Sequence, residues 1–383
     1  MAKYKLGDIC EIVSGSTPKT GVDEYWDGDF KWITPAELND DTYIITDSVR
    51  KITELAVKKT GLSSFPEGTV ILSSRAPIGK VAIAGCEMYC NQGFKNLICS
   101  DKINNRYLYW FLKGNTEYLN SLGRGATFKE ISKSIVSEIE INVPDLNEQA
   151  VAVANLEKIS KIIAIRRQEL SALDDLIKAR FVELFGDPVS NPYGYDKVAL
   201  SELAEIKIGP FGSLLHKEDY IEGGHPLLNP SHIIDGKVSP DDKLTISDKK
   251  YEELSAYQLK TGDVVMGRRG EMGRCAVVPS EGFLCGTGSI LIRSKGEITA
   301  DYIQKIISFP SFKKTIEDMA VGQTMPNLNV PIVSGFQIIK PPIEVQDSYY
   351  DFVHQVDKSK VAVQKALDET KELFDSLMQQ YFG

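Results

Sequence analysis

The sequence lacks the features that mark membrane proteins and disulfide-rich secreted proteins. Its 383 residues contain no apolar run close to the ~20 residues that a membrane-spanning helix needs, and the first residues carry no signal-peptide pattern. The six cysteines form no CxxC pair and the four histidines do not cluster with them, so no zinc site is indicated. We therefore expect a cytoplasmic protein with reduced thiols, without a bound metal and without membrane contact.

Motifs of the common catalytic classes are missing as well. The sequence has no N-P-P-aromatic signature of a nucleotide methyltransferase. Lys80 in the segment IGK has neither the upstream glycine nor the following serine or threonine of a phosphate-binding P-loop. Pro240, Asp241 and Asp248 weakly imitate a metal-dependent nuclease pattern, but the first half of the chain has no counterpart. The sequence therefore predicts no catalytic residue and no cofactor in this chain, with a self-contained nuclease as an alternative.

Two stretches without an internal proline or glycine, 147–186 and 344–383, predict two long helices. In each stretch, large side chains recur every seven residues, which is the pattern of a helix that packs along another helix. These positions are Leu156, Ile163, Leu170, Ile177 and Leu184 in the first stretch, and Val353, Leu367, Phe374 and Tyr381 in the second. Each helix alone would expose its apolar stripe to water, so we expect the two to pair; two independent surface helices are the alternative.

The chain contains an internal duplication. The segment GTVILSSRAPIGKVAI from Gly68 matches GDVVMGRRGEMGRCAV from Gly262 without a gap, and both predict two β-strands joined by a polar loop. The segment GATFKEISKSIVSEIEINVP from Gly125 matches GQTMPNLNVPIVSGFQIIKP from Gly322. The matched segments and the two predicted helices follow in the same order, so we expect two similar halves.

This duplication predicts an α+β protein in which two long antiparallel helices separate two similar globular α/β domains, related by a pseudo-two-fold axis. We expect the first globular domain at residues 1–146 and the first long spacer helix at 147–190. The second globular domain is expected at 191–343 and the second spacer helix at 344–383. A parallel pairing of the helices would break the symmetry and require a long return connection.

Polar and cationic side chains in the predicted loops indicate recognition of DNA. Two similar units on a rigid spacer suit a partner of repeating geometry, and arginine pairs with guanine or clamps phosphate. The net charge of -9 argues against a simple polycationic binder, but it leaves room for a local basic surface. The candidates in the first half are Thr17, Lys19, Arg75, Lys80, Asn91, Gln92, Lys95, Arg124, Thr127 and Lys129. The candidates in the second half are Ser213, Lys217, Arg268, Arg269, Arg274, Thr287, Gln323, Thr324 and Asn327.

Residues that match between the halves cannot easily distinguish two different DNA half-sites. Arg75 matches Arg269 and Thr127 matches Thr324, so these residues are expected to hold a loop or a phosphate. The residues that discriminate between bases are expected where the halves differ, as at Arg268.

Several segments together resemble one protein family over the whole length of the chain. They are SGSTPKT followed by EYWDGDFKWITPAEL, IGPFGSLLHKEDYIEGGHPLLNPSHI, the paired segments from Gly68 and Gly262, and LFGDP at the end of the first long helix. In these segments the chain resembles the specificity (S) subunit of type I restriction-modification systems. The resemblance implies two target recognition domains, each of which reads one half of a bipartite site in double-stranded DNA.

The resemblance also implies partner subunits, which would carry the chemistry. Two modification subunits would dock on the long helices and methylate adenine with S-adenosylmethionine. Restriction/translocase subunits would use ATP and magnesium to translocate and cleave DNA. This chain itself would be a non-catalytic subunit, in agreement with its missing motifs. A coiled-coil adaptor protein that does not recognise DNA is a further alternative.

Overall fold

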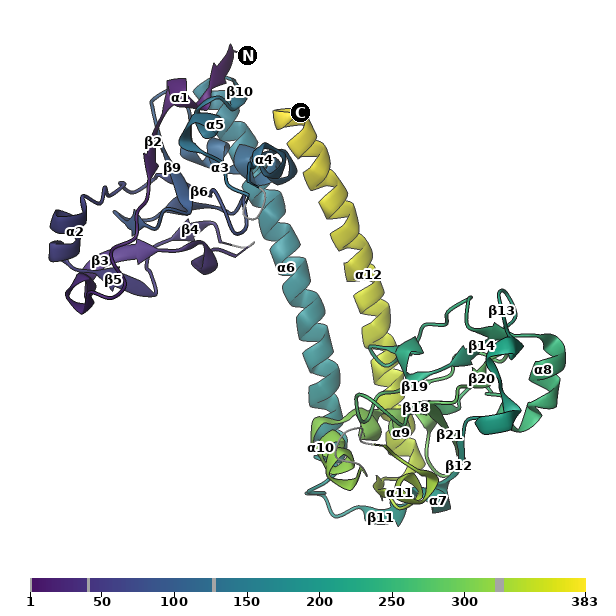
Figure 1. The fold of residues 1–383 in the computed structure, drawn as a ribbon. Coiled ribbons are helices and arrows are strands. Elements are labelled where there is room, and N and C mark those ends of the chain that lie inside the picture. Colours follow the sequence, from purple (N-terminus) through teal and green to yellow (C-terminus); the bar gives the residue numbers. More distant parts are fainter. Residues whose placement is uncertain (1, 40–41, 126–128, 321–326) are drawn as a thin grey trace. The chain divides into compact units, whose positions relative to one another are not determined.

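The structure is a computed structural model that describes residues 2–39, 42–125, 129–320 and 327–383 (Figure 1). Contacts between residues divide the chain into two compact units. Unit 1 consists of Met1–Glu169 and Val363–Gly383, and unit 2 consists of Leu170–Ala362. Because both boundaries fall inside long helices, each of these helices contributes one segment to each unit.

Two sheets form the frame of unit 1. The five-stranded sheet has the order β2 (Cys10–Ser14), β9 (Phe94–Cys99), β6 (Val70–Ser73), β7 (Val81–Ala84) and β4 (Ile44–Ile45). The three-stranded sheet has the order β5 (Arg50–Ile52), β3 (Trp26–Ile33) and β8 (Tyr89–Cys90). A separate antiparallel pair consists of β1 (Ala2–Lys5) and β10 (Glu140–Val143).

Short helices connect and cover these strands. The α-helices are α1 (Leu6–Ile9), α2 (Glu54–Thr60), α3 (Asn105–Gly114), α4 (Thr116–Leu122) and α5 (Lys133–Ser137), and the 3-10 turns are η1 (Asp23–Tyr25) and η2 (Pro35–Glu37). Helix α3 packs against β6 and β7. The Asn104 side chain accepts hydrogen bonds from two backbone N–H groups of the first turn of α3, which fixes where this helix begins.

Unit 2 repeats this frame. Its first sheet has the order β12 (Ala204–Ile208), β21 (Ser289–Ser294), β18 (Val264–Gly267) and β19 (Cys275–Val277). Its second sheet has the order β13 (Tyr220–Ile221), β17 (Thr245–Ile246), β14 (His225–Leu228) and β20 (Leu284–Cys285). The separate pairs are β11 (Asp196–Ala199) with β22 (Gln337–Lys340), and β15 (Ile233–Ile234) with β16 (Lys237–Val238).

The short helices of unit 2 also follow the order of unit 1. They are α7 (Leu200–Leu203), α8 (Asp248–Glu253), α9 (Ala300–Ser308), α10 (Pro310–Met319) and α11 (Val330–Ser334), with the 3-10 turns η3 (Gly212–Leu214), η4 (Lys217–Asp219), η5 (Pro230–His232) and η6 (Ser255–Tyr257). Strand register agrees as well: Val70 lies opposite Leu97 in unit 1, and Val264 lies opposite Ile292 in unit 2. The predicted internal repeat is therefore confirmed at the level of strand pairing.

The predicted hairpins from Gly68 and Gly262 are the β6–β7 and β18–β19 pairs. All four residues of β6 and of β18 are buried, because both faces of the sheet are covered. Val70 belongs to the core cluster that includes α3, whereas Ile71 belongs to a second cluster on the opposite face. This alternation is the two-residue period of a strand.

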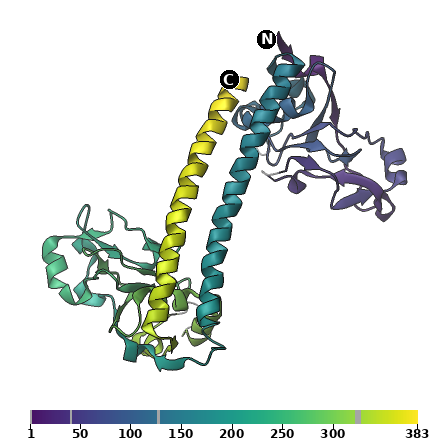
Figure 2. The same ribbon diagram turned by 180° about the vertical axis from the view of Figure 1, so that it is seen from behind.

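Both predicted long helices are present: α6 (Leu146–Phe185) and α12 (Ile343–Phe382) run without interruption (Figures 1 and 2). The Asp145 carboxylate accepts hydrogen bonds of 2.9 Å from the backbone N–H groups of Asn147 and Glu148 at the start of α6. Gly186 adopts a positive φ of 69° directly after α6, as glycine commonly does where a helix ends.

Within each unit the segments of α6 and α12 run antiparallel. In unit 1, Asn155 near the start of α6 donates to the hydroxyl of Tyr381 near the end of α12, at 2.9 Å. Figure 2 shows these two helix ends side by side. In unit 2, the Tyr349 hydroxyl near the start of α12 donates to the Ile177 carbonyl oxygen of α6, at 3.3 Å.

The heptad side chains contact the globular parts as well as the other helix. Leu156, Ile177 and Leu367 are buried, and the remaining predicted pairing residues, Ile163, Leu170, Leu184, Val353, Phe374 and Tyr381, are half-buried. The Phe374 ring lies 5.7 Å from the Trp110 ring of α3. The apolar side chains of the two long helices therefore belong partly to the cores of the two units. They do not pack only between the two helices, as they would in an isolated coiled coil.

A buried glutamine connects the start of each long helix to the globular part before it. Sequence analysis missed this feature. The Gln149 side-chain oxygen accepts from the Asn104 backbone N–H at 2.7 Å, and that of Gln346 accepts from the Thr299 backbone N–H at 2.9 Å. Each glutamine also donates to the carbonyl oxygen of the proline five residues earlier. Because both amides are fully buried and hydrogen-bonded, they fix how each long helix leaves its globular part.

Candidate nucleic-acid interface

In unit 1 the loop between β6 and β7 forms one wall of a cleft. The cleft has a volume of about 700 Å³. Its walls consist of Thr34, Pro35, Ala36, Arg75, Ala76, Pro77, Ile78, Asn91, Asn120 and Lys129. Three of the predicted DNA-binding residues, Arg75, Asn91 and Lys129, therefore line the same cleft.

Thr17 and Lys19 lie on the loop that follows β2, and two tryptophans of β3 hold this loop. The Trp32 indole N–H donates to the carbonyl oxygen of the residue before Thr17, at 3.0 Å. The Trp26 indole N–H donates to the Lys19 carbonyl oxygen at 3.3 Å. The Thr17 hydroxyl in turn donates to the side-chain oxygen of Gln92. The structure thus brings Thr17 and Gln92 together, next to the cleft.

A glycine starts the corresponding loop in each unit, because the backbone there passes very close to a second loop. A Cβ atom at Gly15 would lie 2.1 Å from the Asn91 carbonyl oxygen, and one at Gly209 would lie 1.9 Å from the Gly286 carbonyl oxygen. Such distances exclude any side chain. The repeated glycine therefore brings the loop after the first sheet strand against the loop that carries Asn91 in unit 1 or Thr287 in unit 2.

Lys95 is a buried cation in unit 1. Its ammonium group lies 3.1 Å from the Ser74 hydroxyl and 3.2 Å from a carboxylate oxygen of Glu130. Only 6% of Lys95 is exposed, whereas Glu130 and Arg75 are half-buried. The Arg75 guanidinium lies 3.9 Å from the same carboxylate. Glu130 therefore neutralises part of the positive charge in this part of unit 1, and sequence analysis did not single it out.

The segment that carries Arg124 and Lys129 pairs with the hairpin. Glu130 forms backbone bridges with both Arg124 and Arg75. The side chains of Arg124 and Lys129 are exposed. The predicted residues Thr127, Gln323 and Thr324 lie outside the residues that the structure describes.

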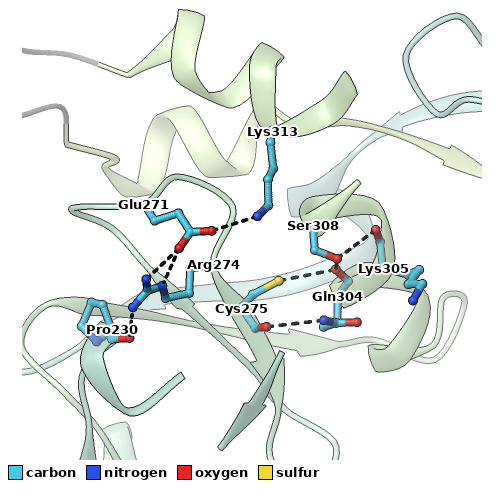
Figure 3. A network of polar contacts seen from close by, with 8 residues as sticks. All are labelled: Pro230, Glu271, Arg274, Cys275, Gln304, Lys305, Ser308 and Lys313. Carbon is cyan, nitrogen blue, oxygen red and sulfur yellow. Dashed lines mark hydrogen bonds and ion pairs between the residues drawn. The ribbon is translucent and has the colours of Figure 1, made fainter. Parts of the chain in front are cut away.

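Lys80 and Arg274 occupy matching places and contact matching backbone turns. The Lys80 ammonium donates to the carbonyl oxygens of Pro35 and Leu38, at 3.1 and 2.5 Å. The Arg274 guanidinium donates to the Pro230 carbonyl oxygen at 3.3 Å (Figure 3). In both units the cation therefore contacts the 3-10 turn after β3 or β14, and we call Lys80 and Arg274 the anchoring cations.

Arg274 belongs to a wider ionic network, which Figure 3 shows. Its guanidinium lies 2.7 Å from the Glu271 carboxylate, and the Lys313 ammonium of α10 lies 3.1 Å from the other oxygen of that carboxylate. These two cations lower the pKa of Glu271 below its usual value. Glu271 therefore balances only part of the positive charge that Arg274 and Lys313 carry together.

Arg268 is held by one side-chain and one backbone hydrogen bond. Its Nε atom donates to the Asn327 side-chain oxygen at 3.0 Å, and its backbone N–H donates to the Gly288 carbonyl oxygen at 3.0 Å. Burial lowers the pKa of the Arg268 guanidinium, with the neighbouring charge of Arg269 as the second cause. Arg269 and Thr287 are exposed. The structure thus brings together Arg268, Arg269, Asn327 and the loop that ends in Gly288.

The loop after β12 places Ser213 and Lys217 in solvent. Phe211 on the same loop is 63% exposed, although large aromatic side chains are usually buried. The repeat matches Phe211 with Thr17, so an exposed ring in unit 2 replaces the hydroxyl that contacts Gln92 in unit 1. Alignment of the two halves could have identified this difference from the sequence.

Within the described ranges, no three His, Cys, Asp or Glu side chains gather in a way that could hold a metal ion. Asp248 of the nuclease-like segment lies 3.1 Å from the ring of His225, and the Asp241 carboxylate accepts from the backbone N–H of Lys243 at 2.9 Å. Among the described helices, none has the length and apolar character that would let it cross a membrane.

Comparison with protein families decides which family this fold belongs to. The model of the type I restriction modification DNA specificity domain matches residues 1–174 and 192–371, that is, both halves of the chain. The chain belongs to this specificity-subunit family. The type I restriction enzyme MjaIX specificity subunit of Methanocaldococcus jannaschii is 30% identical, over 98% of this chain and 90% of that protein. The MjaVIII specificity subunit of the same organism is 22% identical over 94% of this chain and 89% of that protein.

Solved structures of this family have the same fold. A structure described as the basis of complex assembly and conformational transition of the type I restriction-modification system has a TM-score of 0.68 and 18% identity, covering 99% of this chain and 97% of that chain. The S subunit from M. genitalium has a TM-score of 0.57 and 16% identity, covering 100% and 96%. The predicted fold class and the family resemblance are therefore confirmed.

Proposed function

We propose that this specificity-family chain selects DNA for a type I restriction-modification complex, with each unit binding one half of a bipartite site in double-stranded DNA. The observation that carries the proposal is the repeated constellation in the two units. In each unit three segments meet at one place. They are the hairpin loop that carries Arg75 or Arg269, the loop that begins at Gly15 or Gly209, and the segment that carries Glu130 or Asn327. Arginine on such loops suits guanine and phosphate.

Within this proposal, matched and unmatched residues have different roles. Arg75 and Arg269 occupy the same backbone position and contact the DNA backbone. Arg268, which Asn327 orients, reads a base edge, because a guanidinium held by a hydrogen bond loses less freedom when it binds. In unit 1 the cleft residues Asn91 and Lys129 are the corresponding readers.

The chemistry belongs to partner subunits in this proposal. Two modification subunits dock on the long helices and methylate adenine with S-adenosylmethionine, and restriction/translocase subunits use ATP and magnesium. Exposed apolar side chains on α6 and α12 support a protein contact there, namely Ile165, Leu176, Val361 and Leu373. We also propose that the recognition domains comprise residues 1–146 and 191–343, and the spacers 147–190 and 344–383.

The test uses the full chain assembled with its modification subunit. Methylation of a random-sequence DNA library, mapped at single-base resolution, should give one bipartite site, and binding should weaken steeply as salt concentration rises. An adaptor without DNA recognition would show no such salt dependence. The full chain alone should neither methylate nor cleave DNA, and nicking by the purified chain with magnesium would revive the nuclease alternative.

A further inference from the structure

The segment before α5 in unit 1 and the segment before α11 in unit 2 place one residue at the same backbone position. In unit 1, Glu130 bridges Arg75, and the next backbone N–H donates to the Ser74 carbonyl oxygen at 3.0 Å. In unit 2, Asn327 bridges Arg269, and the next N–H donates to the Arg268 carbonyl oxygen at 2.9 Å. The two units therefore present a carboxylate and an amide at equivalent points.

The cation that contacts this backbone position also differs between the two units. In unit 1 the cation that reaches this position is Lys95 on β9, at 3.2 Å from Glu130. Strand register matches Lys95 with Ile290 in unit 2, because these residues lie opposite Leu72 and Met266 of the paired hairpins. In unit 2 the cation comes from the hairpin itself.

Charge at these positions can be compared directly. Arg75, Lys95 and Glu130 together carry one net positive charge in unit 1. Arg268 and Arg269 carry two in unit 2, because Asn327 is neutral. These two sets of residues therefore differ by one charge at the point where the segment meets the hairpin. A charge at a DNA-binding surface acts on phosphate regardless of base sequence.

Resting on the proposed function, we propose that Glu130 is a specificity-determining residue of unit 1 that weakens sequence-independent attraction to DNA phosphate. Its carboxylate, held by the buried Lys95, competes with phosphate for Arg75, so unit 1 binds mainly where its base contacts fit. Glu130 then limits binding to unrelated DNA, while Arg75 stays available to contact the cognate site.

The test measures binding of the complex with its modification subunit to cognate and to unrelated duplex DNA over a range of salt concentrations. In Glu130→Gln, affinity for unrelated DNA should rise by roughly 3- to 10-fold at low salt, because unit 1 gains one net positive charge. The slope of log affinity against log salt should steepen by about 0.9. The preference for cognate over unrelated DNA should fall accordingly.

Two matched variants separate charge from structure. The double variant Lys95→Ile with Glu130→Asn copies the neutral residues of unit 2 and restores one net positive charge, so its slope should return to that of the unmodified protein. Asn327→Asp adds a negative charge to unit 2 and should reduce the slope by about 0.9. Thermal unfolding of each variant identifies any loss of folded protein.

The outcomes are distinguishable. A lower melting temperature with an unchanged or shallower slope in Glu130→Gln would show that Glu130 only holds the segment, and would overturn the inference. A steeper slope in both Glu130→Gln and the double variant would overturn it as well. If the unmodified complex binds cognate and unrelated DNA alike, the proposed function itself fails, whatever the variants do.

Discussion

The two units repeat the same order of main elements but carry different polar side chains at equivalent places. Unit 2 has a buried ion pair where unit 1 has a neutral group: Asp263 is 2% exposed and forms two 2.7 Å contacts with Arg293. Its counterpart Thr69 is 1% exposed and donates to the Pro66 carbonyl oxygen at 2.7 Å. Both residues follow the same turn before the hairpin.

The comparison teaches which interactions duplication preserves. Backbone ladders, the close glycine contacts and the buried glutamines are present in both units, because each involves groups that the fold itself brings together. A side-chain pair such as Lys95 with Glu130 involves only two side chains, so it can change in one unit without disturbing the strands. The following variants test this division, beginning with the variant that should change stability most.

Loss of the buried ion pair should have the largest effect on stability. Asp263→Ala leaves the Arg293 guanidinium without its carboxylate partner and should lower the free energy of unfolding of unit 2 by roughly 3 kcal/mol. This value is near the lower limit for a broken buried ion pair, because Arg293 is partly exposed. The matched Thr69→Ala removes one neutral hydrogen bond and should cost about 1 kcal/mol in unit 1. Hydrogen exchange measured by mass spectrometry resolves both units. Equal losses in the two units would contradict the comparison.

The close glycine contacts should be equally necessary in both units. Gly15→Ala and Gly209→Ala place a Cβ atom against a carbonyl oxygen, and each should lower the free energy of unfolding by about 1 to 3 kcal/mol. Gly21→Ala is the control, since a Cβ atom there would meet no atom within 4 Å, and it should change stability by less than about 0.5 kcal/mol. Thermal unfolding provides the measurement. A large effect in one unit only would show that the loops are not equivalent.

The arginines should separate phosphate contacts from base contacts. Arg75→Ala should weaken binding to all DNA sequences about alike, whereas Arg268→Ala should relax discrimination at one base position by about 1 to 3 kcal/mol. Selection of methylated sites from a random-sequence library by the assembled complex measures both effects. If Arg75→Ala relaxes one base position and Arg268→Ala weakens all sequences alike, the two assignments must be exchanged.

The anchoring cations should show the smallest effect, slightly larger for Arg274 because it also loses its 2.7 Å contact with Glu271. Lys80→Met and Arg274→Met each remove hydrogen bonds to a 3-10 turn and should cost about 1 kcal/mol of stability. The salt dependence of DNA binding should stay as in the unmodified protein, because neither cation is free to neutralise a phosphate. A slope that becomes shallower by about 0.9 in either variant would instead identify that cation as a phosphate contact.

Much of the architecture could be predicted because its signals are local. The heptad spacing from Leu156 and the absence of proline and glycine predicted both long helices, although α6 ends at Phe185 rather than at the expected residue 190, because Gly186 follows it. The β6–β7 and β18–β19 hairpins followed from two apolar runs around a polar loop. Repetition of these signals predicted the duplication, since each half folds by the same short-range rules.

The candidate site could be predicted only as a set of loops. Arg75, Asn91 and Lys129 do share one cleft, as their places in those loops suggested. Lys80 and Arg274 instead contact the Pro35 and Pro230 carbonyl oxygens, which lie more than forty residues away along the chain. Sequence alone could not show this, because the direction of a long cationic side chain depends on which carbonyl oxygens the packing leaves within reach.

The elements, their order and the repeat could thus be predicted from the sequence, since periodicity, glycine and proline act over a few residues. Which charges are free depends on how distant segments of the chain pack together. This packing places Glu130 beside Lys95 and Asn327 beside Arg268, although each pair is far apart in sequence. The physical reason is that the effect of a charge depends on its neighbours in space and on its exposure to water, and both are set when distant segments pack together.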